Sequence, residues 1–216
     1  VSQWGSALQY ASEELKADRE IVSEAVSQWG SALQYASEEL RSDHEIVLKA
    51  VGHEFGDGLP LEYASEELGA DRDFIWNVWE LWDYSTAGAE FALLTASEEL
   101  RADRDFMLEA VRKNGNALEY ASEELTADRD FVLEAISQSV FVLEFASDEL
   151  KADREIVLAA VSQNGYAVQY ASEELRADRE IAEAAVRKDG TSLLWVDRSL
   201  RKDPELIALA NQSKED

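Results

Sequence analysis

Pairs of adjacent acidic residues are the feature of this 216-residue sequence that most suggests chemistry. Seven such pairs recur: Glu13/Glu14, Glu38/Glu39, Glu66/Glu67, Glu98/Glu99, Glu123/Glu124, Asp148/Glu149 and Glu173/Glu174. Paired carboxylates can act in acid–base catalysis or bind a cation, but catalysis needs one constellation and not a repeated one. We interpret the pairs first as a solvated face, with Glu13 paired to Lys16, and second as a strip for a basic partner. Calcium binding is a third interpretation, although no D-x-D-x-D-G loop is present.

Other reactive residues give no recognisable site. His44 and His53 lie nine residues apart, without the H-E-x-x-H spacing of a metal site, and we expect both at the surface. The recurring serine of A-S-E-E has no G-x-S-x-G context, and the chain has no cysteine and no glycine-rich phosphate loop. The sequence therefore predicts no catalytic residue, no metal ligand and no cofactor, and we expect a protein that is not an enzyme.

One aromatic stretch occurs only once, F-I-W-N-V-W-E-L-W-D-Y-S-T-A-G at residues 74–88. Trp79 falls in a regular core position, whereas Trp76, Trp82 and Tyr84 add aromatic surface. These four residues are our candidates for a protein-interaction site, because Trp and Tyr dominate interface hot spots. Alternatively, they fill an irregular joint in the packing; a pigment or another apolar ligand is a third possibility.

A second set of aromatic residues recurs at one position: Tyr10, Tyr35, Tyr63, Tyr120, Phe145 and Tyr170, with Thr95 and Trp195 as irregular members. We expect these rings to pack between repeats, with the hydroxyl at the edge. A surface for stacking a ligand is the alternative.

An internal repeat must position all of these residues. An aspartate followed three places later by an apolar pair recurs with spacings of 25, 28, 32, 25, 25, 25 and 25 residues, at Asp18, Asp43, Asp71, Asp103, Asp128, Asp153, Asp178 and Asp203. Each repeat reads as two helices, since Ala7, Leu8, Ala11 and Leu15 form one stripe and residues 21–26 form another.

Local signals mark the ends of these helices. We expect each aspartate to cap the second helix and Pro204 to occupy a first turn, as Pro60 does in a first helix. Glycines close most repeats, at Gly30, Gly58, Gly115, Gly165 and Gly190, where we expect left-handed C-terminal caps.

Helices of about ten residues are marginal alone, so neighbouring repeats must bury their apolar stripes against one another. The sequence predicts an all-α fold, an α-solenoid of about eight 25-residue two-helix repeats. We expect a single array over residues 1–216, with an irregular joint at about 76–95 and a capping unit at about 190–216. Because Val1–Gly5 corresponds to Val26–Gly30, we also expect the chain to be part of a longer array.

The amino-acid composition limits the classes of partner and the compartments that we expect for this protein. The formal net charge of −26, from 46 acidic and 20 basic residues, repels nucleic acid and anionic membranes. Charged residues interrupt every apolar run, so we expect no membrane-spanning helix. The lack of cysteine fits the cytoplasm or an organelle interior better than secretion.

The string L-Q-Y-A-S-E-E-L-R-A-D-R-E-I-V occurs almost unaltered from Leu8, from Leu33 and, with valine leading, from Val168. It resembles the repeat of a family catalogued as domain of unknown function 4116, which is abundant in algae and other protists, often in long tandem arrays. The resemblance implies a helical repeat and an algal source, and it supplies no catalytic residues.

These observations together predict a non-enzymatic scaffold that binds other proteins, including partners with a basic surface, as an accessory or linker subunit of a larger assembly. The resemblance suggests an organellar or photosynthetic assembly of an alga. The alternative is an acidic spacer or cation-binding array that acts through its charge.

Overall fold

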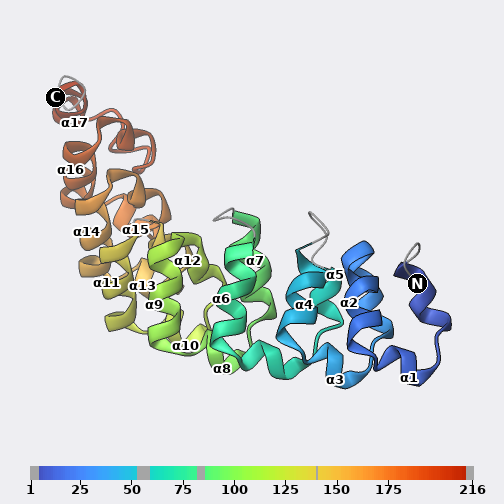
Figure 1. Ribbon diagram of the computed structural model, residues 1–216. Coiled ribbons are helices and arrows are strands. Elements are labelled where there is room, and N and C mark those ends of the chain that lie inside the picture. The colour runs from blue at the N-terminus through green and yellow to red at the C-terminus, as the bar shows by residue number, and fades with distance from the viewer. Residues whose placement is uncertain (1–4, 53–58, 82–85, 140, 213–216) are drawn as a thin grey trace. The chain divides into compact units, whose positions relative to one another are not determined.

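The computed structural model describes residues 5–52, 59–81, 86–139 and 141–212. All regular structure in these ranges is helical, which confirms the predicted all-α fold. Two compact units, Val1–Arg101 and Ala102–Asp216, divide the chain. The repeats can be followed within each unit (Figure 1).

The first unit stacks its second helices in chain order, with α2 packed against α4 and α4 against α6; α6 also packs against α7, the first helix of the following repeat. The elements are η1 (Gly5–Tyr10), α1 (Glu13–Lys16), α2 (Arg19–Gln28), η2 (Gly30–Tyr35), α3 (Glu38–Arg41), α4 (His44–Val51), α5 (Leu59–Glu62), η3 (Glu66–Ala70), α6 (Arg72–Leu81), α7 (Thr86–Thr95) and α8 (Glu98–Arg101), where η marks a 3-10 helix.

The second unit repeats the arrangement, with α9, α11, α14, α16 and α17 packed one against the next. Its elements are α9 (Arg104–Lys113), η4 (Gly115–Tyr120), α10 (Glu123–Thr126), α11 (Arg129–Gln138), α12 (Val142–Phe145), α13 (Asp148–Lys151), α14 (Arg154–Gln163), η5 (Gly165–Tyr170), α15 (Glu173–Arg176), α16 (Arg179–Lys188), η6 (Gly190–Leu194) and α17 (Pro204–Gln212).

The core lies between successive repeats. Each long helix buries the stripe that its periodicity predicts; in α11 this stripe is Phe131, Val132, Ala135 and Ile136. Removing such stripes from water stabilises each unit, at about 1.5–3 kcal/mol for each large apolar side chain. Because the buried partner of each stripe is the next repeat, no repeat has a complete core of its own.

The first helix of each repeat differs from the prediction. The expected single helix over Ala7–Leu15 is two pieces, η1 and α1, separated by Ser12 in extended conformation (φ −66°, ψ 160°). The next repeat shows the reason, because the Ser37 N–H donates to the carbonyl of Lys16 in the preceding repeat at 2.9 Å instead of to its own helix. The serine hydroxyl then caps the short helix that follows, as Ser12 does for the Leu15 N–H.

The glycines also differ from the prediction. Gly30, Gly115 and Gly165 begin 3-10 helices, and none of the three has the positive φ of a left-handed cap. A Cβ on Gly165 would lie 2.4 Å from the carbonyl oxygen of Ala185 in the next repeat. The close packing of the two repeats therefore requires a residue without a side chain at this position. Gly58 lies outside the described residues.

Both prolines occupy first turns, as predicted. Pro204 is the first residue of α17, and Pro60 is the second residue of α5, so neither removes a hydrogen bond from a helix interior.

Candidate functional site

The recurring aspartate caps the long helix of every repeat, as predicted from the sequence. In each case a side-chain oxygen accepts a hydrogen bond from a backbone N–H two or three residues ahead; the eight are Asp18, Asp43, Asp71, Asp103, Asp128, Asp153, Asp178 and Asp203. The carboxylate also lies at the positive end of the helix dipole. The chain therefore fixes the start of each long helix with a local contact.

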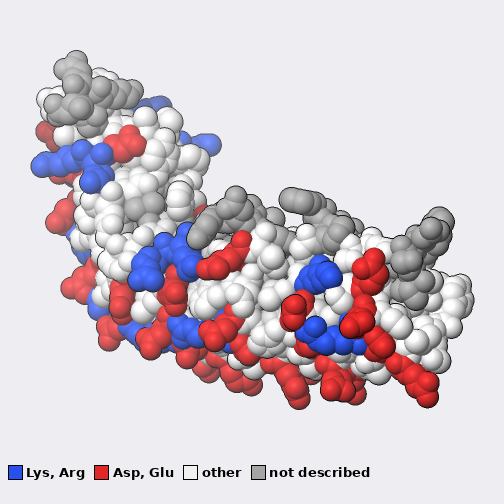
Figure 2. All heavy atoms as spheres, viewed as in Figure 1, with Lys and Arg blue, Asp and Glu red and all other residues white. Residues whose placement is uncertain are grey.

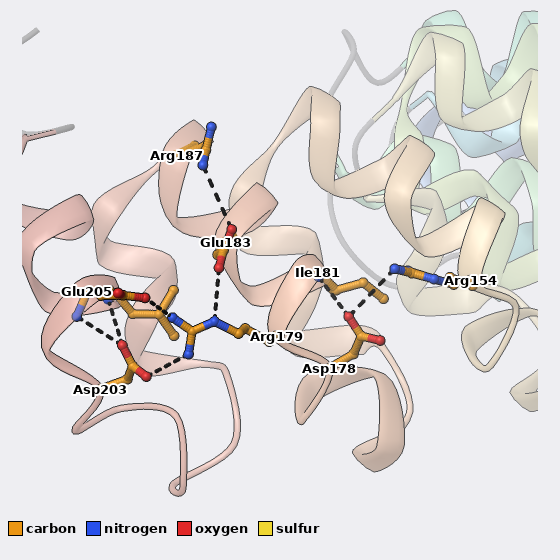
Figure 3. A network of polar contacts seen from close by, with 9 residues as sticks. Arg154, Asp178, Arg179, Ile181, Glu183, Arg187, Asp203 and Glu205 are labelled. Atoms are coloured by element: carbon orange, nitrogen blue, oxygen red, sulfur yellow. Dashed lines mark hydrogen bonds and ion pairs between the residues drawn. The ribbon is translucent and has the colours of Figure 1, made fainter.

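In the second unit, an arginine of the preceding repeat contacts the capping aspartates Asp153, Asp178 and Asp203. Arg179, the first residue of α16, lies 2.7 Å from Asp203 and also contacts Glu205 of the last repeat (Figure 3). Arg154 makes the corresponding contacts with Asp178, at 3.8 Å, and with Glu180. Arg129 does the same with Asp153, at 3.2 Å, and with Glu155. One cation thus holds the cap and the first turn of the following helix, a set that we name the arginine bridge.

The first unit contains the same arrangement. Arg19 lies 3.2 Å from Asp43 and 2.6 Å from Glu45. In the next repeat His44 takes the place of the arginine, and its Nε2 lies 3.3 Å from Asp71. His44 is exposed at the surface, as predicted, and His53 lies outside the described residues. Sequence reasoning missed the bridge, although the D-R-x motif at a period of 25 residues was its signal.

The bridge changes the ionisation of the capping aspartates. The Arg179 guanidinium, together with the Leu206 N–H, holds the pKa of Asp203 below its usual value. Partial burial raises the pKa of Asp153, but the Ile156 N–H and Arg129 outweigh it, and the pKa is lowered overall. These carboxylates are therefore ionised at neutral pH and used in holding repeats together.

The acid pairs remain at the surface. The first acid of a pair has a side chain that is 90% exposed at Glu13, 98% at Asp148 and 94% at Glu173. In the first unit the pairs lie on α1, α3, η3 and α8, and acidic side chains line the edge that these elements form, at the bottom of the view (Figure 2). We name this edge of the first unit, made by the pairs that begin at Glu13, Glu38, Glu66 and Glu98, the acidic edge.

The predicted contact of Glu13 with Lys16 is present at 2.9 Å. The corresponding residues are 3.9 Å apart at Asp148 and Lys151 and 4.0 Å apart at Glu173 and Arg176. Such exposed pairs add little stability. The second acid of each pair also remains exposed, so the acidic edge keeps most of its negative charge available to solvent or to a partner.

The tryptophan candidates lie on and after α6. Trp79 is buried, with 1% of its surface exposed, in the core position that its spacing predicts. Trp76 is half-buried, and its ring centroid lies 5.4 Å from that of Trp79. Trp82 and Tyr84 lie outside the described residues, so the aromatic interaction site stays a prediction.

The aromatic positions of the repeat connect neighbours, in line with the packing interpretation. The Tyr35 hydroxyl lies 3.5 Å from the Gln9 side chain of the preceding repeat. Burial raises the pKa of Tyr170, and a hydrogen bond to Glu144 of the preceding repeat raises it further. Tyr10, which has no described repeat before it, is 85% exposed.

Within the described residues, His, Asp and Glu side chains form no group of three that could hold a metal ion. None of the described helices combines the length and the apolar character needed to cross a membrane.

The comparison with known families agrees with the repeat. The family model described as "Domain of unknown function (DUF4116)" matches residues 1–33, 18–54, 90–126 and 128–176, which together make up more than half of the chain. No curated protein and no solved structure matches the chain significantly. The repeated matches confirm the resemblance seen in the sequence. The chain belongs to this family of tandem helical repeats, whose function is unknown.

Proposed function

We propose that the chain is a non-enzymatic scaffold that binds other proteins through its acidic edge, as an accessory or linker subunit of a larger assembly. One observation supports this proposal: the acidic residues of the repeat fall into a bound group and an exposed group. The capping aspartates are bound to backbone N–H groups and arginines, whereas the first acid of a pair is almost fully exposed at Glu13, Asp148 and Glu173.

A row of this kind suits a partner with a complementary basic surface. Exposed charges give modest energy singly, but they steer association and fix its register. The packed long helices hold successive pairs in place, so a partner can meet several of them without ordering the scaffold first.

The experiment is affinity capture from the native source with the purified chain and two variants. The test variant carries three substitutions on the acidic edge, Glu13→Gln, Glu38→Gln and Glu98→Gln. The control variant has the same change in charge at exposed positions on the long helices α2, α6 and α7, Glu24→Gln, Glu80→Gln and Glu90→Gln.

We expect the test variant to lose most of the captured proteins and the control to keep them. Capture should also weaken as salt is raised, because exposed charges are screened. Equal capture by both variants would remove the acidic edge from the proposal. A wild-type chain that captures no protein would overturn the scaffold function itself.

The exposure of the acids also favours a second candidate, an acidic spacer or cation-binding array. Calcium titration separates the two, because a binding array predicts a saturable, stoichiometric rise in melting temperature at micromolar calcium. A scaffold predicts only a gradual effect of ionic strength.

A further inference from the structure

The repeat is broken at two positions that lie together in the first unit. The residue two places before the capping aspartate is basic in most repeats, as at Lys16, Arg41, Arg101, Lys151 and Arg176, but it is Gly69 in the third repeat. The aromatic position of the following repeat is Thr95 instead of tyrosine. The Ser97 N–H donates to the Gly69 carbonyl at 2.7 Å. This hydrogen bond brings Gly69 close to Thr95, which stands two residues before Ser97.

The full α-helix α7 explains why glycine is needed. Other repeats begin with a shorter 3-10 or α-helical segment, whereas α7 runs ten residues to Thr95. A Cβ on Gly69 would lie 2.6 Å from the Thr95 carbonyl oxygen. The close approach of α7 therefore excludes the long basic side chain that this position carries elsewhere.

The two missing side chains leave a groove between α5, η3 and α7, with a volume of about 330 Å³. Leu61, Phe91 and Leu94 give it an apolar lining. Leu94 is 57% exposed, so its side chain is accessible from solvent. This volume is at the low end of the range for ligand pockets, roughly 300–1,000 Å³, and fits a large side chain.

The groove is also acidic. Glu62 and Glu66 line it and are exposed. The residue equivalent to Glu66 in the first repeat is Glu13, which has a cation three residues later, Lys16 at 2.9 Å. In the third repeat that cation is replaced by Gly69, so the chain supplies the acid without its usual partner in the helix.

We propose that this groove receives an arginine side chain from a basic segment of a partner protein. The inference rests on the scaffold function proposed above and names where one residue of the partner docks. The aliphatic stem of the arginine packs on Leu61 and Leu94, and its guanidinium faces Glu62 and Glu66. An arginine suits this combination because it pairs a long apolar stem with a weakly hydrated, planar cation.

The test uses nuclear magnetic resonance of the isotope-labelled chain with two peptides, acetyl-Gly-Gly-Arg-Gly-Gly-amide and the same peptide with citrulline. Citrulline has nearly the shape of arginine and no charge. We expect the arginine peptide to shift the amide signals of Gly69, Leu94 and Thr95 in a saturable way. The citrulline peptide should bind about threefold to tenfold more weakly, since two exposed carboxylates each contribute a modest attraction.

Two variants test the groove in different ways. Thr95→Tyr restores the aromatic ring of the repeat and should abolish the shifts by filling the space. Glu62→Gln with Glu66→Gln keeps the space and should reduce binding of the arginine peptide to that of the citrulline peptide. Glu38→Gln with Glu39→Gln removes the same charge from the acidic edge outside the groove and should leave binding unchanged.

Several outcomes would overturn the inference. Equal affinity for both peptides would show that charge plays no part. Shifts confined to the acid pairs at Glu13, Glu38 and Glu98, which lie outside the groove, would show that arginine binds elsewhere. If Thr95→Tyr and the double variant Glu62→Gln with Glu66→Gln both bind the arginine peptide as the wild type does, the groove is excluded. The double variant keeps this test valid if Thr95→Tyr perturbs the fold. The capture experiment separates this inference from the function: a wild-type chain that captures proteins while its groove ignores the arginine peptide remains a scaffold.

Discussion

Replacing Asp153 separates the two contacts that hold the start of α14. Its carboxylate accepts hydrogen bonds from the N–H groups of Glu155 at 2.9 Å and Ile156 at 3.1 Å, and it also lies 3.2 Å from Arg129. Asp153→Asn keeps a side-chain oxygen that can cap the helix, because asparagine caps as well as aspartate, but it removes the charge. Asp153→Ala removes both contacts.

We expect Asp153→Ala to lower the free energy of unfolding by about 1–2 kcal/mol, mostly from the lost cap. Asp153→Asn should cost less than half as much, because the Arg129 pair is partly exposed and solvent screens it. Urea unfolding followed by far-ultraviolet circular dichroism measures both. Hydrogen exchange locates the loss, which should fall on the first turn of α14.

Acid provides a second readout of the same pair of variants. Since the pKa of Asp153 is lowered in the folded chain, its ionised form stabilises the fold above the unfolded pKa of about 3.9. That contribution is lost as the pH falls through the folded pKa. The stability difference between the wild type and Asp153→Asn should therefore shrink between pH 6 and pH 2.5.

Two results would refute this reasoning. An Asp153→Asn variant that is as unstable as Asp153→Ala would show that the charge, and not the cap, fixes the helix start. A stability difference from Asp153→Asn that is independent of pH would show that the bridge to Arg129 does not hold the carboxylate in its ionised form.

Two further matched comparisons test the packing. Gly165→Ala should lower the free energy of unfolding in urea by about 1–3 kcal/mol, because the new Cβ would lie 2.4 Å from the Ala185 carbonyl oxygen. Gly52→Ala adds only ordinary contacts in helical conformation, so it should be neutral or stabilise the fold by up to about 1 kcal/mol. Equal losses would show that the close approach at Gly165 relaxes easily. Leu93→Ala should lower stability by about 2–5 kcal/mol, since Leu93 is fully buried, whereas Leu94→Ala, 57% exposed, should change it by less than about 0.5 kcal/mol; a reversed order in thermal unfolding would contradict the placement of α7.

Features set by short-range contacts could be predicted from the sequence. The carboxylate of a capping aspartate reaches an N–H only two or three residues ahead, so the position of Asp128 alone fixes the start of α11. The stripe of α11 follows from helical periodicity in the same way, and Trp79 falls in the corresponding stripe of α6. The exposure of the acid pairs follows from the cost of burying a charge.

Features set by a neighbouring repeat required the tertiary structure. The first helix of the second repeat is broken because the Ser37 N–H finds the Lys16 carbonyl, and Gly165 is required because the Ala185 carbonyl approaches it. The groove at Gly69 and Thr95 arises where two substitutions in different repeats meet. The period of the repeat could be read directly from the recurring residues. The long helices and their caps could be predicted because stripes and caps depend on residues within a turn or two of each other. The roles of the glycines, serines and arginines required the tertiary structure, because their partners lie about 20 to 24 residues away along the chain and come close only when the repeats stack.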